Sequence, residues 1–297
     1  MKTNPFYGVH TALATPMKGG AVDYASMGRL VDYQIAQGIQ GLVPAGTTGE
    51  SPTLDYDEHI EVVRFTVERA KGKVPVMAGA GSNSTTEQLE LVRRAVDAGA
   101  ECLLLVAPYY NKPNQEGLFR HFGAAAKSTN KPIILYSIPG RCVIDIAIPT
   151  VKRLHREFPN IIGIKDSGAT TDRVSEMRRE LGPKFIILSG DDSLTLPMIA
   201  CGADGVISVA SNLAVKPIVE MVRLTRAGDL AGAKKLHLKY FPLFKNIFTE
   251  PSPAPIKHAL RRAGLIASAE VRPPLCEITQ ATAKLVDATL RELGLAK

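Results

Sequence analysis

Short apolar segments rich in Val, Ile and Leu recur along the chain, and each is followed by a cluster of Gly, Pro, Ser or Thr. None of them alternates cleanly between polar and apolar positions, which is typical of strands that are buried on both faces of a parallel sheet. The pattern therefore predicts eight parallel strands. They are expected at residues 10–16, 41–46, 74–81, 102–108, 132–139, 161–167, 185–192 and 205–211.

The stretches between these strands carry apolar residues at three- and four-residue spacing, which predicts amphipathic helices. The first such helix ends at Gly38, and the second begins with acidic residues and ends with basic ones. Thr85 and Gln88, at the start of the third, predict a capping box. Helices are expected at residues 24–38, 57–72, 85–100, 116–129, 149–159, 172–182 and 193–204.

Eight strand–helix units within roughly 230 residues match the count and size of an α/β (β/α)8 TIM barrel. A doubly wound sheet would need fewer units and a glycine-rich phosphate loop after its first strand, which HTALATPMKGG matches poorly. After residue 215 the strand pattern ends and only helical stretches follow. We therefore predict a barrel over residues 1–228, with its active site at the C-terminal ends of the strands, and a C-terminal helical region over residues 229–297.

The charge and cysteine content exclude several classes of protein. The net charge is +7, but basic residues are interspersed with acidic ones and Trp is absent, which argues against a nucleic-acid surface. Cys102, Cys142, Cys201 and Cys276 form no CxxC pair and have apolar neighbours, so we expect buried, reduced thiols in a cytoplasmic protein. The N-terminus lacks the apolar segment of a signal peptide, and no apolar run has the length of a membrane span.

Metal and serine-hydrolase chemistry find little support in the sequence. The six histidines form no HxH, HxxxH or HExxH group, so no metal site is expected. No GxSxG motif of the nucleophile-elbow type is present either.

Lys165 is the one Lys or Arg inside any predicted strand core, in the stretch IIGIKDSGA. Such a lysine can form a structural ion pair, here with Asp191, Asp192 or Glu50. Alternatively, burial disfavours the charged ammonium and frees a neutral amine that can attack a carbonyl to form an imine. The lysine alone leaves the two interpretations equally open.

Three neighbouring strand ends favour imine chemistry on an oxo acid. The turn GTTGE offers backbone N–H groups and the hydroxyls of Thr47 and Thr48 to a carboxylate, although such a turn also serves as an ordinary helix start. Tyr136 can act as a proton donor or as a core residue, and Arg141 can bind a carboxylate or remain solvated. Together they provide the groups that an imine-forming site requires.

Six motifs occur in order along the chain: GTTGES, APYYNKPNQEGLFRHF, YSIPGR, GIKDSG, SGDD and GVISV. As a set they closely resemble the dihydrodipicolinate synthase and N-acetylneuraminate lyase superfamily of class I, lysine-dependent aldolases. The resemblance extends from about residue 6 to residue 294 and includes EPSPAPIKHAL. The second threonine of GTTGE and Arg141 favour the synthase branch, which condenses pyruvate with L-aspartate 4-semialdehyde in lysine biosynthesis.

The resemblance implies a role for each candidate residue. Lys165 forms the imine with pyruvate, so no metal or organic cofactor is needed, and Tyr136 moves protons through a relay of hydroxyls. The tyrosine that matches Tyr110 is donated across a subunit interface in the family, so a homo-oligomer, a dimer of dimers, is expected. The expected catalytic residues are Lys165, Tyr136, Thr48 and Tyr110, and the expected substrate-binding residues are Thr47, Thr48, Arg141, Ile207 and Gly190.

The resemblance also implies an allosteric site, because many synthases of this kind are inhibited by L-lysine bound in a cavity at a dimer interface. Alternatively, the matching polar residues only cap helices and line a wet interface. The matching residues are Ser51, Tyr56, His59, Asn83, Glu87 and Tyr109.

Three residues depart from the family pattern without removing a reacting group. Ser137 stands where asparagine is common, the lysine is followed by DSGA in place of the more frequent EA, and Cys142 stands where threonine is usual. Two alternatives to the synthase therefore stay open. One is another pyruvate aldolase of the superfamily, acting on N-acetylneuraminate or a 2-keto-3-deoxy sugar acid, and the other is a barrel that binds an oxo acid as a sensor without catalysis.

Overall fold

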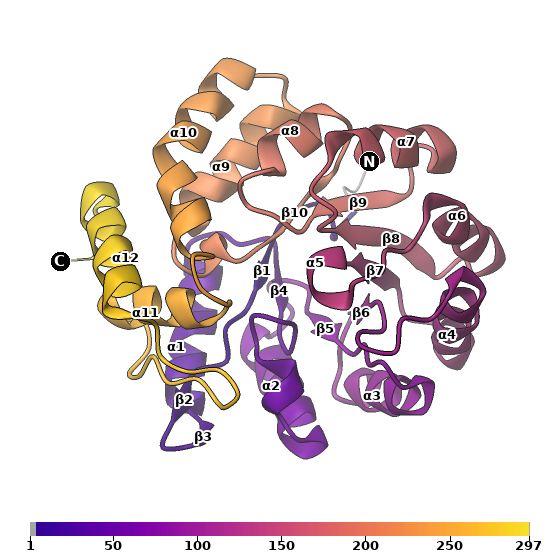
Figure 1. The fold of residues 1–297 in the computed structure, drawn as a ribbon, viewed down its shortest axis with the longest axis horizontal. Helices are drawn as coiled ribbons and strands as arrows, with labels where there is room; N and C mark the ends of the chain where they lie inside the picture. Colours follow the sequence, from indigo (N-terminus) through magenta and orange to yellow (C-terminus); the bar gives the residue numbers. More distant parts are fainter. Residues whose placement is uncertain (1–3, 297) are drawn as a thin grey trace.

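The computed structural model describes residues 4–296 as a closed parallel barrel surrounded by helices (Figure 1). The order of the strands in the sheet is β4-β1-β10-β9-β8-β7-β6-β5, and a parallel bridge between Leu42 and Val76 closes the ring. This confirms the predicted (β/α)8 fold with its C-terminal helices. The strands are β1 (Gly8–Ala12), β4 (Gly41–Val43), β5 (Met77–Gly79), β6 (Cys102–Val106), β7 (Ile133–Ser137), β8 (Ile161–Asp166), β9 (Ile186–Ser189) and β10 (Gly205–Ser208).

Helices cover the outside of the barrel, as the spacing of apolar residues predicts. The barrel helices are α1 (Tyr24–Ala36), α2 (Tyr56–Ala70), α3 (Thr85–Asp97), α4 (Gln115–Ser128), α6 (Ile148–Glu157), α7 (Thr171–Leu181), α8 (Thr195–Ala200) and α9 (Val215–Arg226). The C-terminal region forms α10 (Leu230–Asn246), α11 (Ala254–Arg262) and α12 (Gln280–Leu293), which lie together on one side of the barrel (Figure 1). None of the helices between residues 4 and 296 is long and apolar enough to cross a membrane.

The strands are buried on both faces, which explains their nearly continuous apolar sequences. All five residues of β7 are buried, and so are five of the six residues of β8. One face of each strand packs inside the barrel and the other packs against the helices. Polar residues in these strands are therefore exceptions, and most of them lie near the C-terminal ends.

Three local features differ from the expectations. The capping box at Thr85 is wrong: Ser84 is the N-cap and accepts from the backbone N–H of Glu87, while the Thr85 hydroxyl pairs with Nδ1 of His121. A short hairpin, β2 (Met17–Lys18) with β3 (Ala21–Val22), has too few residues to show a pattern. Two short helical segments, η1 (Ser51–Thr53) and α5 (Pro139–Cys142), follow β4 and β7.

The prediction that all four cysteines are buried is only partly correct. Cys102 and Cys142 are buried, Cys201 is half-buried and Cys276 is exposed, and all four are free thiols. Cys276 lies in the irregular segment before α12, where no helix or sheet covers it. Apolar neighbours in sequence did not indicate burial there, because that segment runs over the surface.

Candidate active site

Lys165 and Tyr136 face each other at the C-terminal ends of adjacent strands. They are register partners on β8 and β7, and Nζ of Lys165 lies 4.1 Å from the centre of the Tyr136 ring. Both are buried, with exposed fractions of 5% for Lys165 and 4% for Tyr136. The ends of β8 and β7 therefore hold an amine next to a phenol ring in a buried site.

None of the three carboxylates considered as partners for Lys165 forms an ion pair with it. Glu50 accepts a hydrogen bond of 2.5 Å from Lys257, and both of those side chains are fully buried. Asp192 accepts from a serine hydroxyl and from two backbone N–H groups at the end of β10, and Asp191 accepts from the turn that follows it. Within residues 4–296, Lys165 has no ion-pair partner, so the structural ion-pair interpretation is wrong.

The turn after β4 presents unused hydrogen-bonding groups. The backbone N–H groups of Thr47 and Thr48 donate to no other group of the described chain, while those of Glu50 and Ser51 close the turn onto the carbonyls of Thr47 and Gly46. The side chain of Thr48 is buried. Glu50 has a left-handed backbone (φ 57°) and begins η1. Two free amides beside two hydroxyls suit a carboxylate.

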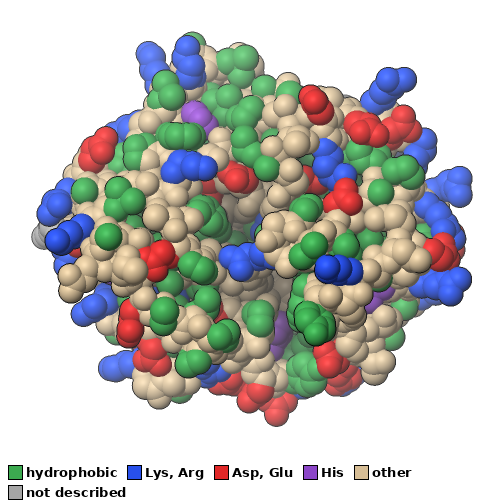
Figure 2. Space-filling model, viewed as in Figure 1, with side chains coloured by type: hydrophobic (Ala, Val, Ile, Leu, Met, Phe, Trp, Pro, Cys, Tyr) green, Lys and Arg blue, Asp and Glu red, His purple; other side chains and the backbone are tan. Residues whose placement is uncertain are grey.

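A cavity of about 360 Å³ opens beside this turn, on the hollowed face seen in Figure 2. Thr47 and Ile138 form part of its wall, and Arg141 lies at the C-terminal end of β7, on α5. The guanidinium of Arg141 contacts only the backbone carbonyl of Ser252, at 3.4 Å, and pairs with no carboxylate of residues 4–296. A free guanidinium at the rim can bind the carboxylate of an incoming ligand.

Gly190 follows β9 and brings the backbone close to Lys165. Its N–H donates to the carbonyl of Asp166 at 2.8 Å. A Cβ at this position would lie 3.0 Å from Cε of Lys165 and 2.0 Å from Oγ of Ser167. A side chain there would collide with the Ser167 hydroxyl and crowd Lys165, so glycine leaves room for both.

Two further expected site residues, Ile207 and Tyr110, lie in very different surroundings. Ile207 is fully buried on β10, as register partner of His10. Tyr110 is 88% exposed, with a left-handed backbone (φ 73°), and makes no side-chain hydrogen bond within residues 4–296. Within the described residues, Tyr110 therefore takes part in no hydrogen-bonded relay.

Five of the six residues of the expected lysine site line the same cavity as Thr47 and Arg141; they are Ser51, Tyr56, His59, Glu87 and Tyr109. Asn83 instead donates to the backbone carbonyl of Tyr109 at 3.1 Å. Nε2 of His59 lies 2.7 Å from the carbonyl of Gly79, and burial lowers the pKa of this histidine. Desolvation, followed by the charge of Glu87, raises the pKa of Tyr56.

Sequence reasoning missed three polar residues around the site. Asp166 and Arg173 form a buried ion pair behind Lys165, and Lys257 is enclosed beside Glu50. The aspartate directly after Lys165 was the only signal for the first pair. Lys257 occupies an ordinary polar position of an amphipathic helix, so only the tertiary structure reveals its burial.

Among residues 4–296, no group of three or more His, Cys, Asp and Glu residues could hold a metal ion.

Comparison with known proteins identifies the family. The model of the dihydrodipicolinate synthetase family matches residues 5–293. The chain belongs to this family. It is 48% identical over 291 residues to 4-hydroxy-tetrahydrodipicolinate synthase of Bartonella bacilliformis, covering 98% of this chain and 99% of the relative. A crystal structure of dihydrodipicolinate synthase from Aquifex aeolicus superposes with a TM-score of 0.96 at 42% identity, covering 98% of this chain and 99% of that chain.

Two further structures of family members contain small molecules. Dihydrodipicolinate synthase from Acinetobacter baumannii, described as complexed with pyruvate, has a TM-score of 0.94 and 38% identity, covering 97% of this chain and 99% of that chain. The enzyme from Cyanidioschyzon merolae, described with lysine bound, has a TM-score of 0.96 and 37% identity, covering 99% of this chain and 100% of that chain. The family thus includes proteins that bind each of these ligands.

Proposed function

We propose that the protein is a lyase that condenses pyruvate with L-aspartate 4-semialdehyde to 4-hydroxy-tetrahydrodipicolinate, in the diaminopimelate route of lysine biosynthesis. The observation that carries this proposal is the unpaired, buried Lys165 beside Tyr136. The names of the relatives support the same activity.

The chemistry needs no group beyond the side chains and the substrates. The amine of Lys165 attacks the keto carbon of pyruvate, and water leaves as the imine forms. Loss of a methyl proton gives an enamine, whose carbon attacks the aldehyde carbon of the second substrate and leaves a hydroxyl group there. The amino group of that substrate then displaces Lys165 from the imine carbon and closes the ring.

The surrounding residues have separate tasks in this scheme. The free N–H groups and hydroxyls of Thr47 and Thr48 bind the carboxylate of pyruvate. Tyr136 lies next to the amine and transfers the protons that imine formation and ring closure require. Gly190 and the carbonyl of Ile207 line the space around the bound pyruvate. Arg141, at the rim of the cavity, receives the carboxylate of the semialdehyde.

A comparison of substrates tests this assignment. Pyruvate with aspartate semialdehyde should give steady turnover, whereas N-acetylneuraminate and 2-keto-3-deoxygluconate should not be cleaved. Arg141→Ala should raise the KM for the semialdehyde far more than the KM for pyruvate. Equal loss for both substrates would remove Arg141 from the acceptor site, and cleavage of a sugar acid would favour another aldolase of the superfamily.

The site is proposed to be complete only in a homo-oligomer, a dimer of dimers. Tyr110 is exposed in the single chain, and we place it in the hydroxyl relay of a partner subunit, next to Thr48. One relative is described as a monomeric variant, so assembly is not uniform among these proteins.

We propose a cytoplasmic location, which suits the free thiols of the chain.

The part of the cavity that is lined by Ser51, Tyr56, His59, Glu87 and Tyr109 is proposed to bind L-lysine as a feedback inhibitor. Glu87 supplies a carboxylate for an ammonium group, and His59, with Nε2 directed to Gly79, can offer Nδ1 as a hydrogen-bond acceptor. Glu87→Gln should weaken inhibition by lysine while leaving turnover without lysine unchanged. Full inhibition of this variant at the same lysine concentration would contradict the site.

A further inference from the structure

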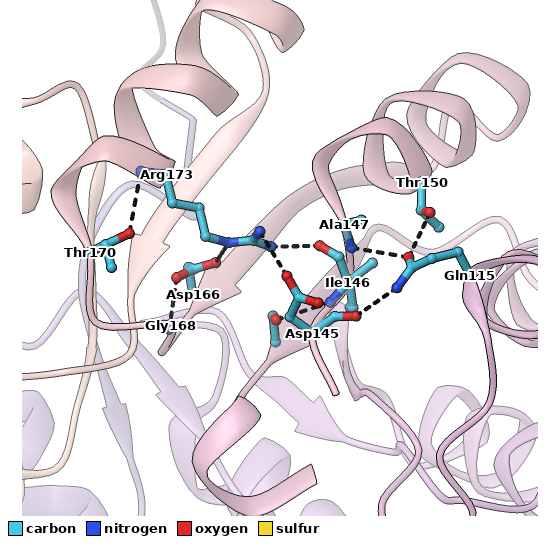
Figure 3. Close-up of polar contacts among 10 residues, drawn as sticks. Gln115, Asp145, Ile146, Ala147, Thr150, Asp166, Gly168, Thr170 and Arg173 are labelled. Carbon is cyan, nitrogen blue, oxygen red and sulfur yellow. Dashed lines mark hydrogen bonds and ion pairs between the residues drawn. The ribbon is translucent and has the colours of Figure 1, made fainter. Parts of the chain in front are cut away.

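Arg173 occupies a central position behind the C-terminal ends of β7 and β8 (Figure 3). Its side chain is only 14% exposed. Nε donates to Oδ2 of Asp166 at 2.6 Å, and Nη2 donates to the carbonyl of Ile146 at 2.5 Å. Nη1 lies 3.3 Å from Oδ2 of Asp145. One guanidinium therefore joins the end of β8 to the segment that follows α5.

Asp166 directly follows Lys165 and is held on several sides. Its side chain is fully buried, and Oδ1 accepts from the backbone N–H of Gly168 at 2.9 Å (Figure 3). Its carbonyl accepts from the N–H of Gly190. With Oδ2 bound to Arg173, the residue after the nucleophile has little freedom to rotate or shift.

The other side of this network reaches the residue that follows Tyr136. The N–H of Ile146 donates to Oγ of Ser137 at 3.3 Å, and the N–H of Ser167 donates to the carbonyl of Ser137 at 2.9 Å. The residues next to Tyr136 and next to Lys165 are thus connected through Arg173 and Ile146.

Gln115 fixes the same segment from the side of α4 (Figure 3). Its Nε2 donates to the carbonyl of Asp145 at 3.0 Å, while its Oε1 accepts from the N–H of Ala147 and from the hydroxyl of Thr150. The segment that Arg173 holds is therefore also bonded to α4 on its other side. A rigid support of this kind can define the distance between two strand ends.

Ser167 shows how a shift of this turn would reach the reacting amine. Its Oγ is buried without a hydrogen-bond partner within residues 4–296. It lies 2.0 Å from the point where a Cβ of Gly190 would be, and Cε of Lys165 lies 3.0 Å from that same point. The Ser167 hydroxyl and the Lys165 side chain therefore both lie against Gly190, whose N–H is bonded to the carbonyl of Asp166.

We propose that Arg173 is a positioning residue for the reaction on Lys165. Through Asp166 it fixes the end of β8 that carries Lys165, and through Ile146 it fixes the end of β7 that carries Tyr136. The inference rests on the proposed imine chemistry and adds to it a residue that does not touch the substrate. Misplacement of a reacting group by about 1 Å can cost about 10²-fold in rate.

Arg178, on the same helix α7, provides a matched control. It is 21% exposed, and its Nη2 pairs with Asp204 at 2.7 Å. It also donates to the backbone carbonyls of Gly202 and Phe185, which precede β10 and β9. These contacts lie at the N-terminal ends of the strands, whereas Lys165 lies at a C-terminal end. Loss of Arg178 removes a comparable ion pair without touching the strand ends that carry the site.

The test compares Arg173→Met, Arg173→Lys and Arg178→Met in the full chain. Each variant is checked for folding by circular dichroism, then mixed with pyruvate and quenched with borohydride at increasing times. Mass spectrometry measures the rate at which the Lys165 adduct appears, and kcat and both KM values are measured in parallel.

Arg173→Met should slow adduct formation and kcat by about 10²-fold, with smaller changes in KM, and added guanidinium should restore part of the rate. Arg173→Lys, which can still pair with Asp166 but cannot hold Ile146 as well, should be intermediate. Arg178→Met should keep the rate within about two-fold, although it destabilises the fold.

If Arg173→Met does not fold, Arg173→Lys and Asp166→Asn/Arg173→Met decide the question. The double variant removes the buried charge together with its partner, so it should fold and still be slow. A folded Arg173 variant with the rate of Arg178→Met overturns the proposal. Absence of any Lys165 adduct in the unmodified protein would instead refute the proposed function, so the two failures are distinguishable.

Discussion

Lys257 donates a hydrogen bond of 2.5 Å to Glu50, and both side chains are completely enclosed. Lys257 belongs to α11 in the C-terminal region, whereas Glu50 closes the turn that contains Thr47 and Thr48. Burial lowers the pKa of Lys257, and the charge of Glu50 opposes this shift. The C-terminal region therefore supplies a buried charge to the mouth of the barrel.

Removal of one member of this pair leaves the other buried and unpaired. Lys257→Met should lower the free energy of unfolding by roughly 3–5 kcal/mol, as measured by urea denaturation. The double variant Glu50→Gln/Lys257→Met removes both charges and should recover most of this loss. A small effect of the single variant, or a double variant that is less stable than the single one, would contradict the pair's role.

The division of the chain at residue 228, between the barrel and the C-terminal helical region, stays a prediction. The Lys257–Glu50 pair joins the two regions across that division. The backbone N–H of Arg272 also donates to Glu50, and its guanidinium binds Glu58 on α2 with two bonds of 2.6 Å. These bonds connect both sides of the boundary. We propose that residues 1–228 alone would not fold stably, which expression of that fragment would test.

Tyr136→Phe removes the hydroxyl group that is proposed to transfer protons. Because general acid–base catalysis contributes about 10²–10⁴-fold, kcat should fall within that range. The fold should be unaffected, since the hydroxyl of Tyr136 makes no hydrogen bond within residues 4–296 and the ring remains over Lys165. Steady-state assays and thermal melting measure the two effects. Unchanged kcat would exclude Tyr136 as the proton-transfer group.

Tyr110→Phe should lower activity although Tyr110 is exposed in the single chain. If the residue acts in a partner's site, a Lys165→Ala subunit can supply an intact Tyr110 to a Tyr110→Phe subunit. Mixing the two variants, with dissociation and reassembly, should then restore part of the activity that each lacks alone. Mixtures no more active than the sum of the separate variants would mean that Tyr110 does not act across an interface.

Buried histidines make stability depend on pH. Burial lowers the pKa of His10 and of His121 to about 4, and it lowers that of His59 in the same direction. Burial raises the pKa of Asp192 to about 6, so the folded protein binds one proton there that the unfolded chain does not. This single proton partly offsets the effect of the histidines. Between pH 6.5 and pH 4 the unfolded chain therefore binds more protons than the folded protein. The stability present above pH 6.5 should be lost as the pH falls through this window.

Urea unfolding at several pH values across this window should show a decrease of about 1.4 kcal/mol per pH unit for each net proton. His10→Leu removes one of these rings and should make the dependence shallower. A free energy of unfolding that is constant or rises on acidification would contradict the assignment of neutral, buried histidines.

The strands were predictable because each is a run of Val, Ile and Leu that ends at small or polar residues, a local property. Lys165 was recognisable for the same reason: a lysine inside a run of isoleucines needs either an ion-pair partner or a chemical role, and the neighbouring strand ends favoured the second. Thr47, Tyr136 and Arg141 followed because the carboxyl ends of barrel strands meet at one mouth. Their selection as candidates depends only on periodicity and on the geometry of the fold, whereas the role of each residue came from the resemblance to the family.

The supporting contacts depend on tertiary packing and were not visible in the sequence. Arg173 lies on a helix with many charged residues, where the usual expectation is a solvated side chain. Glu50 was one of three carboxylates considered as ion-pair partners of Lys165, and only the position of Lys257 on α11 shows that Glu50 is paired elsewhere. Ser84 took the N-cap in place of Thr85 because the chain enters the helix one residue earlier.

Trapping of the imine tests the central claim most directly. The protein is incubated with pyruvate and borohydride, digested, and analysed by mass spectrometry, with Lys165→Ala as the control. We predict a reduced pyruvate adduct on the peptide that contains Lys165, and none in the variant. An adduct on another lysine, or an equal adduct in Lys165→Ala, would contradict the assignment of Lys165 as the nucleophile.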